Sequence, residues 1–462
     1  MLTYDLDQRG RLARYDYLYR CIREDILAGR LTAGEKLPSK RALASHLQTA
    51  VVTVENAYAQ LEAEGYVYTR EKRGYYVAAV ELRHTDPAHA PVHAAPPIRP
   101  SWLLDLRSGG SGTEGFPFSV WAKLMRRVLS EEGEALLRAT PPSGVDALRE
   151  AIARHLYRFR GIDAAPEQIV VGAGTEYLYN LIVQLLGREL VYGVEDPGYS
   201  KAARIYTLSG ARTAPVRVDE NGVLPAALET SGAQILHTSP NHQFPTGAVT
   251  PIGRRQSLLR WAEAQPERCI IEDDYDSEFR FTLRPIPTLK SIDRAGRVIY
   301  VNTFSRTLAP SLRISYMVLP DALAACYRER LGFYSCTVPA MEQYTLSRFL
   351  DEDYFESHIN RMRSFYRARR DEVISAIARS PLAPRCRVSG EDAGLHFLLT
   401  LDTAHPDHEL AAAAEAHGLR LSFLSDFALS EGTTMPHVLV VNYPGVELEH
   451  LDRALHLLCG LL

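Results

Sequence analysis

Three groups of residues have the types and spacing that could bind or transform a small ligand. Gly172-Ala173-Gly174-Thr175 separates an apolar run from a helical pattern, and free backbone N–H groups at the start of a helix suit a phosphate. Asp273 and Tyr275 follow another apolar run, at the carboxyl end of a predicted strand, where open α/β sheets place ligand-binding groups. The segment from Thr303 to Arg313 contributes hydroxyls and two further arginines. Each of these segments, taken alone, could equally be an ordinary loop.

The segments that must position these residues alternate between strand-like and helix-like patterns. Short apolar runs occur at 168–171, 268–271 and 297–301. Strands that alternate with helices are typical of βαβ units, so we expect an α/β domain with a parallel sheet.

The C-terminal part has a different pattern. From about Cys336 a long helical stretch is predicted at 341–377, followed by short strands around 396–401 and 438–442. This pattern predicts a second, smaller α/β lobe.

The first eighty residues predict a small domain of three helices and a hairpin. Leu18, Tyr19, Ile22 and Ile26 repeat with helical spacing. Ser39 can cap a short second helix that continues to Leu47. A third helix is expected over about 51–64, with its apolar face formed by Val54, Ala57, Tyr58 and Leu61.

The opposite face of this third helix carries Thr53, Asn56 and Gln60, whose side chains suit base edges in a major groove. The alternating stretch that follows predicts a hairpin with a basic tip at Arg70, Lys72, Arg73 and Gly74. Three helices and a basic hairpin are the layout of a winged helix-turn-helix domain.

Composition and charge narrow the function classes. The chain has 462 residues, of which 46% are hydrophobic and 23% charged, with a formal net charge of −4. The composition is that of a globular protein, and the whole chain is not a polycation that would bind nucleic acid nonspecifically. Its first eighty residues are nevertheless slightly basic, whereas the remainder is acidic. We find no apolar run long enough for a membrane span and no secretory signal, and we expect a cytoplasmic protein. The six cysteines have no paired spacing, and neither a disulfide framework nor a metal site is expected.

A proline-rich stretch separates the two parts of the chain. Residues 81–102 contain five prolines and almost no large apolar side chains. Such a stretch predicts a linker between a first domain at 1–80 and a second at 103–462, extended enough to reach a neighbouring subunit. A loop packed on its own domain is the alternative.

The first part resembles the GntR-type winged helix domain. The resemblance rests on LPSKRALA, on TVENAYAQLEAEGY and on the glycine of the wing. It implies that the residues that contact DNA are Ser39, Lys40, Arg41, Thr53, Asn56, Lys72 and Arg73. Many members begin the recognition helix with Ser-Arg, whereas this chain has Ala50-Val51, so its operator is expected to differ.

The remainder resembles the fold-type-one aminotransferases, which use pyridoxal phosphate. The resemblance rests on PSGVDALREAIARHLYRFRG, VEDPGY, SPNHQFPTG, IEDDYDSEFR and TLAPSLRISYMVLP. A GntR-type domain joined to this fold is the architecture of the MocR/GabR-type transcriptional regulators. That family implies double-stranded operator DNA and a small-molecule effector as partners. It also implies a homodimer in which each DNA domain packs on the partner's large domain.

The same resemblance implies a role for each ligand-site residue. Asp273 would pair with the pyridine nitrogen of pyridoxal phosphate, Tyr275 would contact its phenolic oxygen, and Tyr199 would stack on its ring. The phosphate would be held by Gly174, Thr175, Thr303 and Arg313. Lys201 lies where a family member can hold an effector carboxylate.

Position 306 departs from the family. The family segment reads Phe-Ser-Lys-Thr-Leu, and its lysine forms the Schiff base with the cofactor; here the residue is Arg306. A guanidinium stays charged and is a poor nucleophile. Lys290 lies sixteen residues earlier in a loop-like segment and does not replace the lysine. Ala139 and Val440 also stand where the family often has a tyrosine and a carboxylate-binding arginine.

These departures predict a regulator whose aminotransferase-like domain senses pyridoxal phosphate, an amine adduct of it or an amino compound, without catalysis. Any bound pyridoxal phosphate is expected to be held non-covalently, with Arg306 in the cofactor site. One alternative is a pyridoxal-phosphate-dependent aminotransferase. Another is a body that no longer binds the cofactor, in which Arg306 holds an anionic effector. The regulated genes, the operator and the direction of regulation do not follow from the sequence.

Overall fold

The computed structural model describes residues 2–10, 12–71, 73–80, 102–107, 115–281, 286–430, 432 and 435–462. The chain divides into two compact units, Met1–Arg99 and Pro100–Leu462. Of the predictions above, those for Lys72 and for nearly all of the 81–102 linker concern residues outside the described parts.

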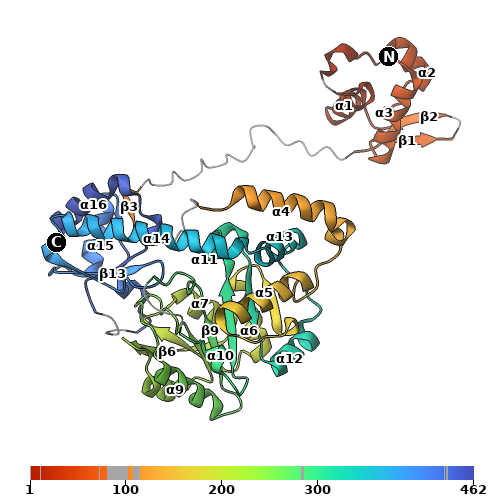
Figure 1. Cartoon of the computed structure of the whole chain (residues 1–462). Helices are drawn as coiled ribbons and strands as arrows, with labels where there is room; N and C mark the ends of the chain where they lie inside the picture. Colours follow the sequence, from red (N-terminus) through yellow and green to blue (C-terminus); the bar gives the residue numbers. More distant parts are fainter. Residues whose placement is uncertain are drawn as a thin grey trace. The chain divides into compact units, whose positions relative to one another are not determined.

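The first unit has the predicted three helices and hairpin (Figure 1). Its elements are α1 (Arg14–Leu27), α2 (Lys40–His46), α3 (Val51–Ala63), β1 (Val67–Arg70) and β2 (Gly74–Val77). The predicted apolar faces of α1 and α3 are buried and form one core. Tyr58 belongs to this core, and its hydroxyl donates a hydrogen bond to the carbonyl of Pro38 at 3.0 Å. Ser39 caps α2 as expected, because its Oγ accepts a hydrogen bond from the backbone N–H of Ala42 at 3.2 Å.

The second unit is built on an eight-stranded sheet in the order β4-β11-β10-β9-β8-β5-β6-β7. The strands are β4 (Ile169–Gly172), β5 (Val191–Asp196), β6 (Arg212–Asp219), β7 (Gly222–Val223), β8 (Ile235–Thr238), β9 (Cys269–Asp273), β10 (Val298–Thr303) and β11 (Ser315–Val318). The predicted parallel pairing is correct for the central strands. It is wrong at two places, because β11 is antiparallel to both β4 and β10 and β7 is antiparallel to β6.

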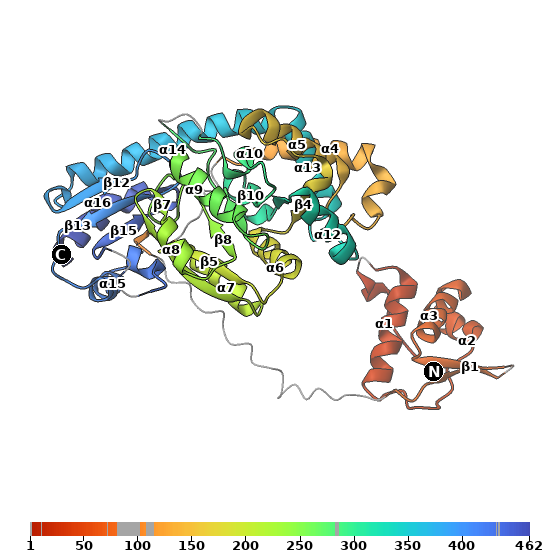
Figure 2. The same cartoon turned by 90° about the horizontal axis from the view of Figure 1, so that it is seen from below.

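Helices cover both faces of this sheet (Figure 2). One face packs against α6 (Thr175–Leu186), α7 (Ser200–Leu208) and α12 (Asp321–Leu331). The other packs against α5 (Asp146–Arg160), α8 (Pro225–Thr230), α9 (Ile252–Glu263), α10 (Leu289–Ile292), α13 (Ala340–Asp351) and α14 (Tyr354–Arg379). Helix α4 (Phe118–Glu131) packs on α13.

The predicted smaller lobe is present. Its antiparallel sheet consists of β12 (Cys386–Ser389), β13 (Phe397–Leu401) and β15 (Val438–Val441), with α15 (Asp407–Ala416) and α16 (Leu448–Leu461) beside it. A further pair, β14 (Leu419–Arg420) with β3 (Leu104–Asp105), connects this lobe to the beginning of the unit. The helical stretch predicted at 341–377 is in fact two helices, because Asp353 adopts a left-handed backbone conformation with φ of 60° between α13 and α14.

No helix in the part of the chain that the structure describes is long and apolar enough to cross a membrane.

Candidate functional site

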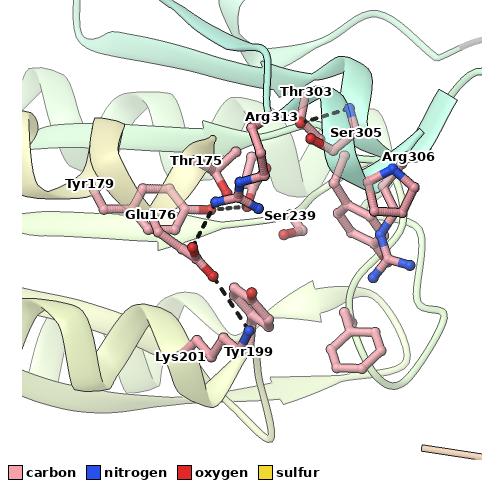
Figure 3. Close-up of a pocket in the computed structure, with 14 residues that line it drawn as sticks. Thr175, Glu176, Tyr179, Tyr199, Lys201, Ser239, Thr303, Ser305, Arg306 and Arg313 are labelled. Carbon is pink, nitrogen blue, oxygen red and sulfur yellow. Dashed lines mark hydrogen bonds and ion pairs between the residues drawn. The ribbon is translucent and has the colours of Figure 1, made fainter. Parts of the chain in front are cut away.

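A cavity of about 300 Å³ lies where several strands of the large sheet end (Figure 3). Strands β4, β5, β8, β9 and β10 run in the same direction, so the segments that follow them meet at one edge. The cavity is lined by Thr175, Glu176, Tyr179, Tyr199, Lys201, Ser239, Phe244, Asp273, Tyr275, Thr303, Ser305, Arg306, Pro310 and Arg313. The structure therefore brings together all the predicted ligand-site residues, with Gly174 immediately before Thr175.

Asp273 is the acidic group on the inner wall of the cavity. It is the last residue of β9 and is buried. Its Oδ2 accepts a hydrogen bond of 2.5 Å from the hydroxyl of Tyr179, and the Nε2 of His237 lies 3.6 Å from the same oxygen. Its Oδ1 is buried and has no hydrogen-bond partner among the described residues. Such an oxygen is suited to a protonated ring nitrogen of a ligand.

Tyr179 is the hydrogen-bond donor that orients this carboxylate. Burial, and after it the negative charge of Asp273, raises the pKa of Tyr179 well above its usual range. The phenol therefore keeps its proton and remains a donor at physiological pH.

The opposite end of the cavity has the features of an anion cradle. Gly174 precedes α6 with φ of 94°, a backbone conformation that L residues with a Cβ rarely adopt. A Cβ at this position would overlap the guanidinium of Arg313, which lies directly against the glycine. The first turn of α6 and Arg313 thus offer N–H donors to one small volume, as phosphate recognition requires.

Glu176 lies between two cations at this end (Figure 3). Its Oε2 is 2.8 Å from Nη2 of Arg313, and its Oε1 is 3.4 Å from Nζ of Lys201. Partial burial opposes ionisation of Glu176, but the charges of Arg313 and Lys201 outweigh it and lower the pKa of this carboxyl. Glu176 is therefore an internal counter-ion in the cradle.

Two tyrosines form the aromatic part of the site. Tyr199 lies between β5 and α7, and its ring has an edge-on contact with Phe244 at a centroid distance of 6.3 Å. Burial, with the charge of Asp273 second, raises the pKa of Tyr199 to about 12. The hydroxyl of Tyr275 lies 3.1 Å from Nδ1 of His242, so it is positioned by a neighbour behind the cavity wall.

A buried group of titratable residues lies behind Tyr275. Nδ1 of His242 is 2.9 Å from Oδ2 of Asp276, and Nε2 of His396 donates a hydrogen bond to the carbonyl of Pro245 at 3.0 Å. Burial lowers the pKa of His396 well below its usual range, so it is neutral. Because their atoms bond to one another and to the backbone, these residues support the wall of the cavity.

Arg306 lies in α11 (Phe304–Thr307), the short helix that follows β10 (Figure 3). Thr303 caps this helix, with its Oγ1 accepting a hydrogen bond from the N–H of Ser305 at 3.1 Å. Arg306 lines the cavity and also a smaller neighbouring one that Tyr275 and His396 share. The residue at the predicted Schiff-base position is thus part of the ligand site.

Lys290 does not replace a lysine at position 306. It lies in the short helix α10 and not in a loop, and its Nζ donates a hydrogen bond to the carbonyl of Val298 at 3.0 Å. It does not line the cavity, whose one lysine among the described residues is Lys201.

The predicted DNA-contacting residues that the structure describes lie at the surface of the first unit. Asn56, Arg41 and Arg73 are exposed and Thr53 is half-buried. The ammonium of Lys40 is 2.6 Å from the carboxylate of Glu55, so any phosphate that it contacts must compete with this partner.

Several lining residues were missed by the sequence reasoning: Glu176, Tyr179, Ser239, Phe244, Ser305 and Pro310. The signals were partly present. Tyr179 follows Thr175 at the i, i+4 spacing that shares one helix face, and Ser239 and Phe244 belong to the SPNHQFPTG segment.

Each of the two units matches a known protein family. Residues 14–77 match the family of bacterial regulatory proteins called gntR, and residues 104–458 match aminotransferase class I and II. YdeL of Bacillus subtilis, an uncharacterized HTH-type transcriptional regulator, is 38% identical over 91% of both chains. The probable rhizopine catabolism regulatory protein MocR of Rhizobium meliloti is 33% identical over 91% of this chain and 88% of its own. The chain belongs to the MocR/GabR-type transcriptional regulators.

The fold of the second unit is that of the aminotransferases. The α-aminoadipate aminotransferase LysN of Thermus thermophilus, solved with N-(5′-phosphopyridoxyl)-L-leucine, superimposes with a TM-score of 0.67 at 25% identity. The match covers 78% of this chain and 92% of LysN. This MocR-type chain is therefore a DNA-binding transcriptional regulator that combines a GntR-type winged helix with an aminotransferase fold.

Proposed function

We propose that the second unit is a catalytically inactive sensor that holds pyridoxal phosphate, or a closely related phosphorylated pyridine, without a covalent bond. Ligand binding in this unit alters how the winged helices bind their operator. The observation that carries the proposal is the presence of Arg306 on the wall of a cavity that otherwise has the groups for such a ligand.

The residues present fit the cofactor in two respects. The unpartnered Oδ1 of Asp273 suits a protonated pyridine nitrogen. The absence of a side chain at Gly174 lets the guanidinium of Arg313 lie against the start of α6, where it suits a phosphate. Tyr199 would contact the ring, and Thr175 and Thr303 would complete the phosphate site.

The residues do not fit covalent catalysis. When bound to a transaminase, pyridoxal phosphate supplies an electron-withdrawing ring that stabilises negative charge on the substrate. Its attachment needs an amine that can lose its proton, and a guanidinium keeps its proton in proteins. Arg306 instead offers a fixed positive charge and planar N–H donors to an anionic or acceptor group of the ligand.

The DNA-binding side of the proposal follows the winged-helix layout. Asn56 and Thr53 of α3 contact bases, and Ser39, Lys40, Arg41, Lys72 and Arg73 contact the backbone of operator DNA. We further propose a homodimer in which each winged helix packs on the partner's large domain. A ligand changes operator affinity only if it binds two arrangements of the dimer differently.

The test is an absorbance titration of the full chain with pyridoxal phosphate at equilibrium, followed by exhaustive dialysis of samples with and without prior borohydride reduction. We expect a cofactor-like spectrum in equilibrium titrations and no cofactor fixed by borohydride in the wild type. Arg306→Lys is expected to fix it, and the double variant Arg306→Lys, Lys201→Gln is expected to fix it equally.

The opposite outcomes are equally clear. Cofactor fixed to the wild type would contradict non-covalent binding, and its loss in Lys201→Gln would identify Lys201 as the reactive amine. No spectral change in the wild type or in Arg306→Lys would contradict the cofactor assignment altogether.

A further inference from the structure

Two apolar side chains are exposed at the start of the recognition helix. Val51 and Val52 are the first two residues of α3, and they keep 44% and 58% of their surface in contact with solvent. Four other residues of the same helix belong to the core of the winged helix: Val54, Ala57, Tyr58 and Leu61. Val51 and Val52 do not belong to this core. Since both valines remain exposed after folding, they do not contribute to the core of this unit and are available for contacts with another molecule.

The residues next to the two valines in α3 are small, amide-bearing or ion-paired. Asn56 is exposed and lies four residues after Val52, on the same face of α3. Glu55, the acidic residue of this end, forms its 2.6 Å ion pair with Lys40. Ala50, which precedes the helix, adds another small apolar group.

Each of these side chains has a preferred partner in a major groove. The N-terminal residues of a recognition helix contact base edges. A carboxamide pairs with N6 and N7 of adenine, whereas an apolar side chain contacts the 5-methyl group of thymine. Bidentate recognition of guanine needs an arginine or a lysine, and neither occurs between Ala50 and Ala63.

We propose that α3 recognises an A·T-rich half-site in which Val51 and Val52 contact thymine methyl groups and Asn56 contacts adenine. This inference deepens the proposed operator binding and rests on it. It predicts which base the start of α3 recognises. Valine at position 51 contacts the methyl group of thymine, whereas an arginine at the same position would select guanine.

The test begins by selecting bound sequences from a randomised DNA duplex with the full-length protein. Each thymine of the selected half-site is then replaced by deoxyuridine, which removes the methyl group and keeps the base pair. We expect one or two positions at which this replacement weakens binding, by about four-fold for each methyl group that loses its contact.

Protein variants assign the effect to the two valines. In Val51→Ala or Val52→Ala the penalty of the matching deoxyuridine is expected to disappear, because the contact is already lost. In Val51→Arg the selected half-site is expected to shift toward guanine. Leu27→Ala is the matched control, since Leu27 is an exposed apolar residue on α1 at 39% exposure, and it should leave the deoxyuridine penalty unchanged.

The outcomes separate this inference from the function on which it rests. A selected operator that binds equally well with deoxyuridine at every position would overturn the thymine contacts and leave operator binding intact. A deoxyuridine penalty that persists in both valine variants would assign the methyl contact to other residues. If no sequence is selected from the pool, operator recognition itself is contradicted.

Discussion

Arg313 and Glu176 form an ion pair of 2.8 Å at the anion cradle of the ligand cavity. The guanidinium that should hold a ligand phosphate is thus already bonded to a carboxylate of the protein. A phosphate bound as proposed would share or displace Glu176, and this competition would lower the affinity of the cradle.

The first prediction concerns this pair. Glu176→Gln should increase the affinity for pyridoxal phosphate several-fold, since it removes a negative charge next to the bound phosphate. Both members are partly exposed, so solvent screening keeps the effect modest. Isothermal titration of the full-length variant measures it, with the exposed Glu220→Gln as the control. Unchanged or weaker binding by Glu176→Gln would show that the carboxylate does not compete with the ligand.

A second prediction concerns the discrimination between ligands at position 306. The wild type should bind pyridoxal phosphate and pyridoxine phosphate with similar affinity, because a guanidinium can donate to an aldehyde or to an alcohol oxygen. Pyridoxamine phosphate should bind more weakly, as its ammonium carries the same charge as Arg306. Arg306→Lys should instead favour pyridoxal phosphate over the alcohol. Titration with the three compounds checks this, and a wild-type preference for the amine would contradict it.

The third prediction tests the cradle through its glycine. Gly174→Ala should abolish phosphate-dependent binding and destabilise the protein. The backbone at this position has a positive φ, which alanine rarely adopts, and the added Cβ would overlap Arg313. Gly253→Ala is the matched control: Gly253 lies in α9 with open space around its Cα, and alanine there should stabilise the helix by up to about 1 kcal/mol. Thermal unfolding and ligand titration of both variants distinguish a local effect from a general one.

A fourth prediction concerns Tyr179. Tyr179→Phe removes the buried hydrogen bond of 2.5 Å to Asp273 and should lower the free energy of unfolding by about 1–3 kcal/mol. It should also weaken the binding of a protonated pyridine, since the carboxylate loses its orientation. Tyr334→Phe, which removes an exposed hydrogen bond to Gln184, is expected to change little. Equal losses in the two variants would argue against a special role for Tyr179.

The fifth prediction is a pH dependence of stability. Burial, with the charge of Asp274 second, raises the pKa of Glu278 to about 7 from 4.5. A carboxyl with a raised pKa in the folded state stabilises the fold fully below pH 4.5, and this contribution is lost as the pH rises through 7. The melting temperature should therefore fall between about pH 4.5 and 7 in the wild type, and fall less over the same range in Glu278→Gln. The expected difference is up to about 3 kcal/mol, and an equal fall in both proteins would contradict the raised pKa.

Much of the site could be predicted because its residues belong to contiguous segments at strand ends. Asp273, Tyr275 and Arg306 lie in runs whose apolar strand is visible in the sequence, and parallel strands deliver their carboxyl ends to one edge. Glu176 could not be assigned in this way. Its ion pairs join residues from three separate segments, whose proximity is not visible in the sequence. The helix dipole also favours a glutamate in the first turn of any helix, so its presence there does not indicate a ligand site.

The errors in the fold have similar causes. The break between α13 and α14 depends on a left-handed Asp353, which has no signal such as glycine or proline. Strand β11 is not among the strands predicted from the sequence, since its four residues, Ser315–Val318, include a serine and a tyrosine. Its antiparallel pairing with β10 and β4 could therefore not be predicted. Lys290 was placed in a loop because α10 has only four residues, too few for a periodic pattern.

The fixed charge of Arg306 has a consequence for signalling. A lysine at this position must lose a proton before it reacts, so the loading of a covalent sensor follows the pH of the cell as well as the supply of its ligand. A guanidinium stays protonated throughout the physiological range. The positive charge that Arg306 contributes to this cavity therefore stays the same when the cell becomes acidic or alkaline.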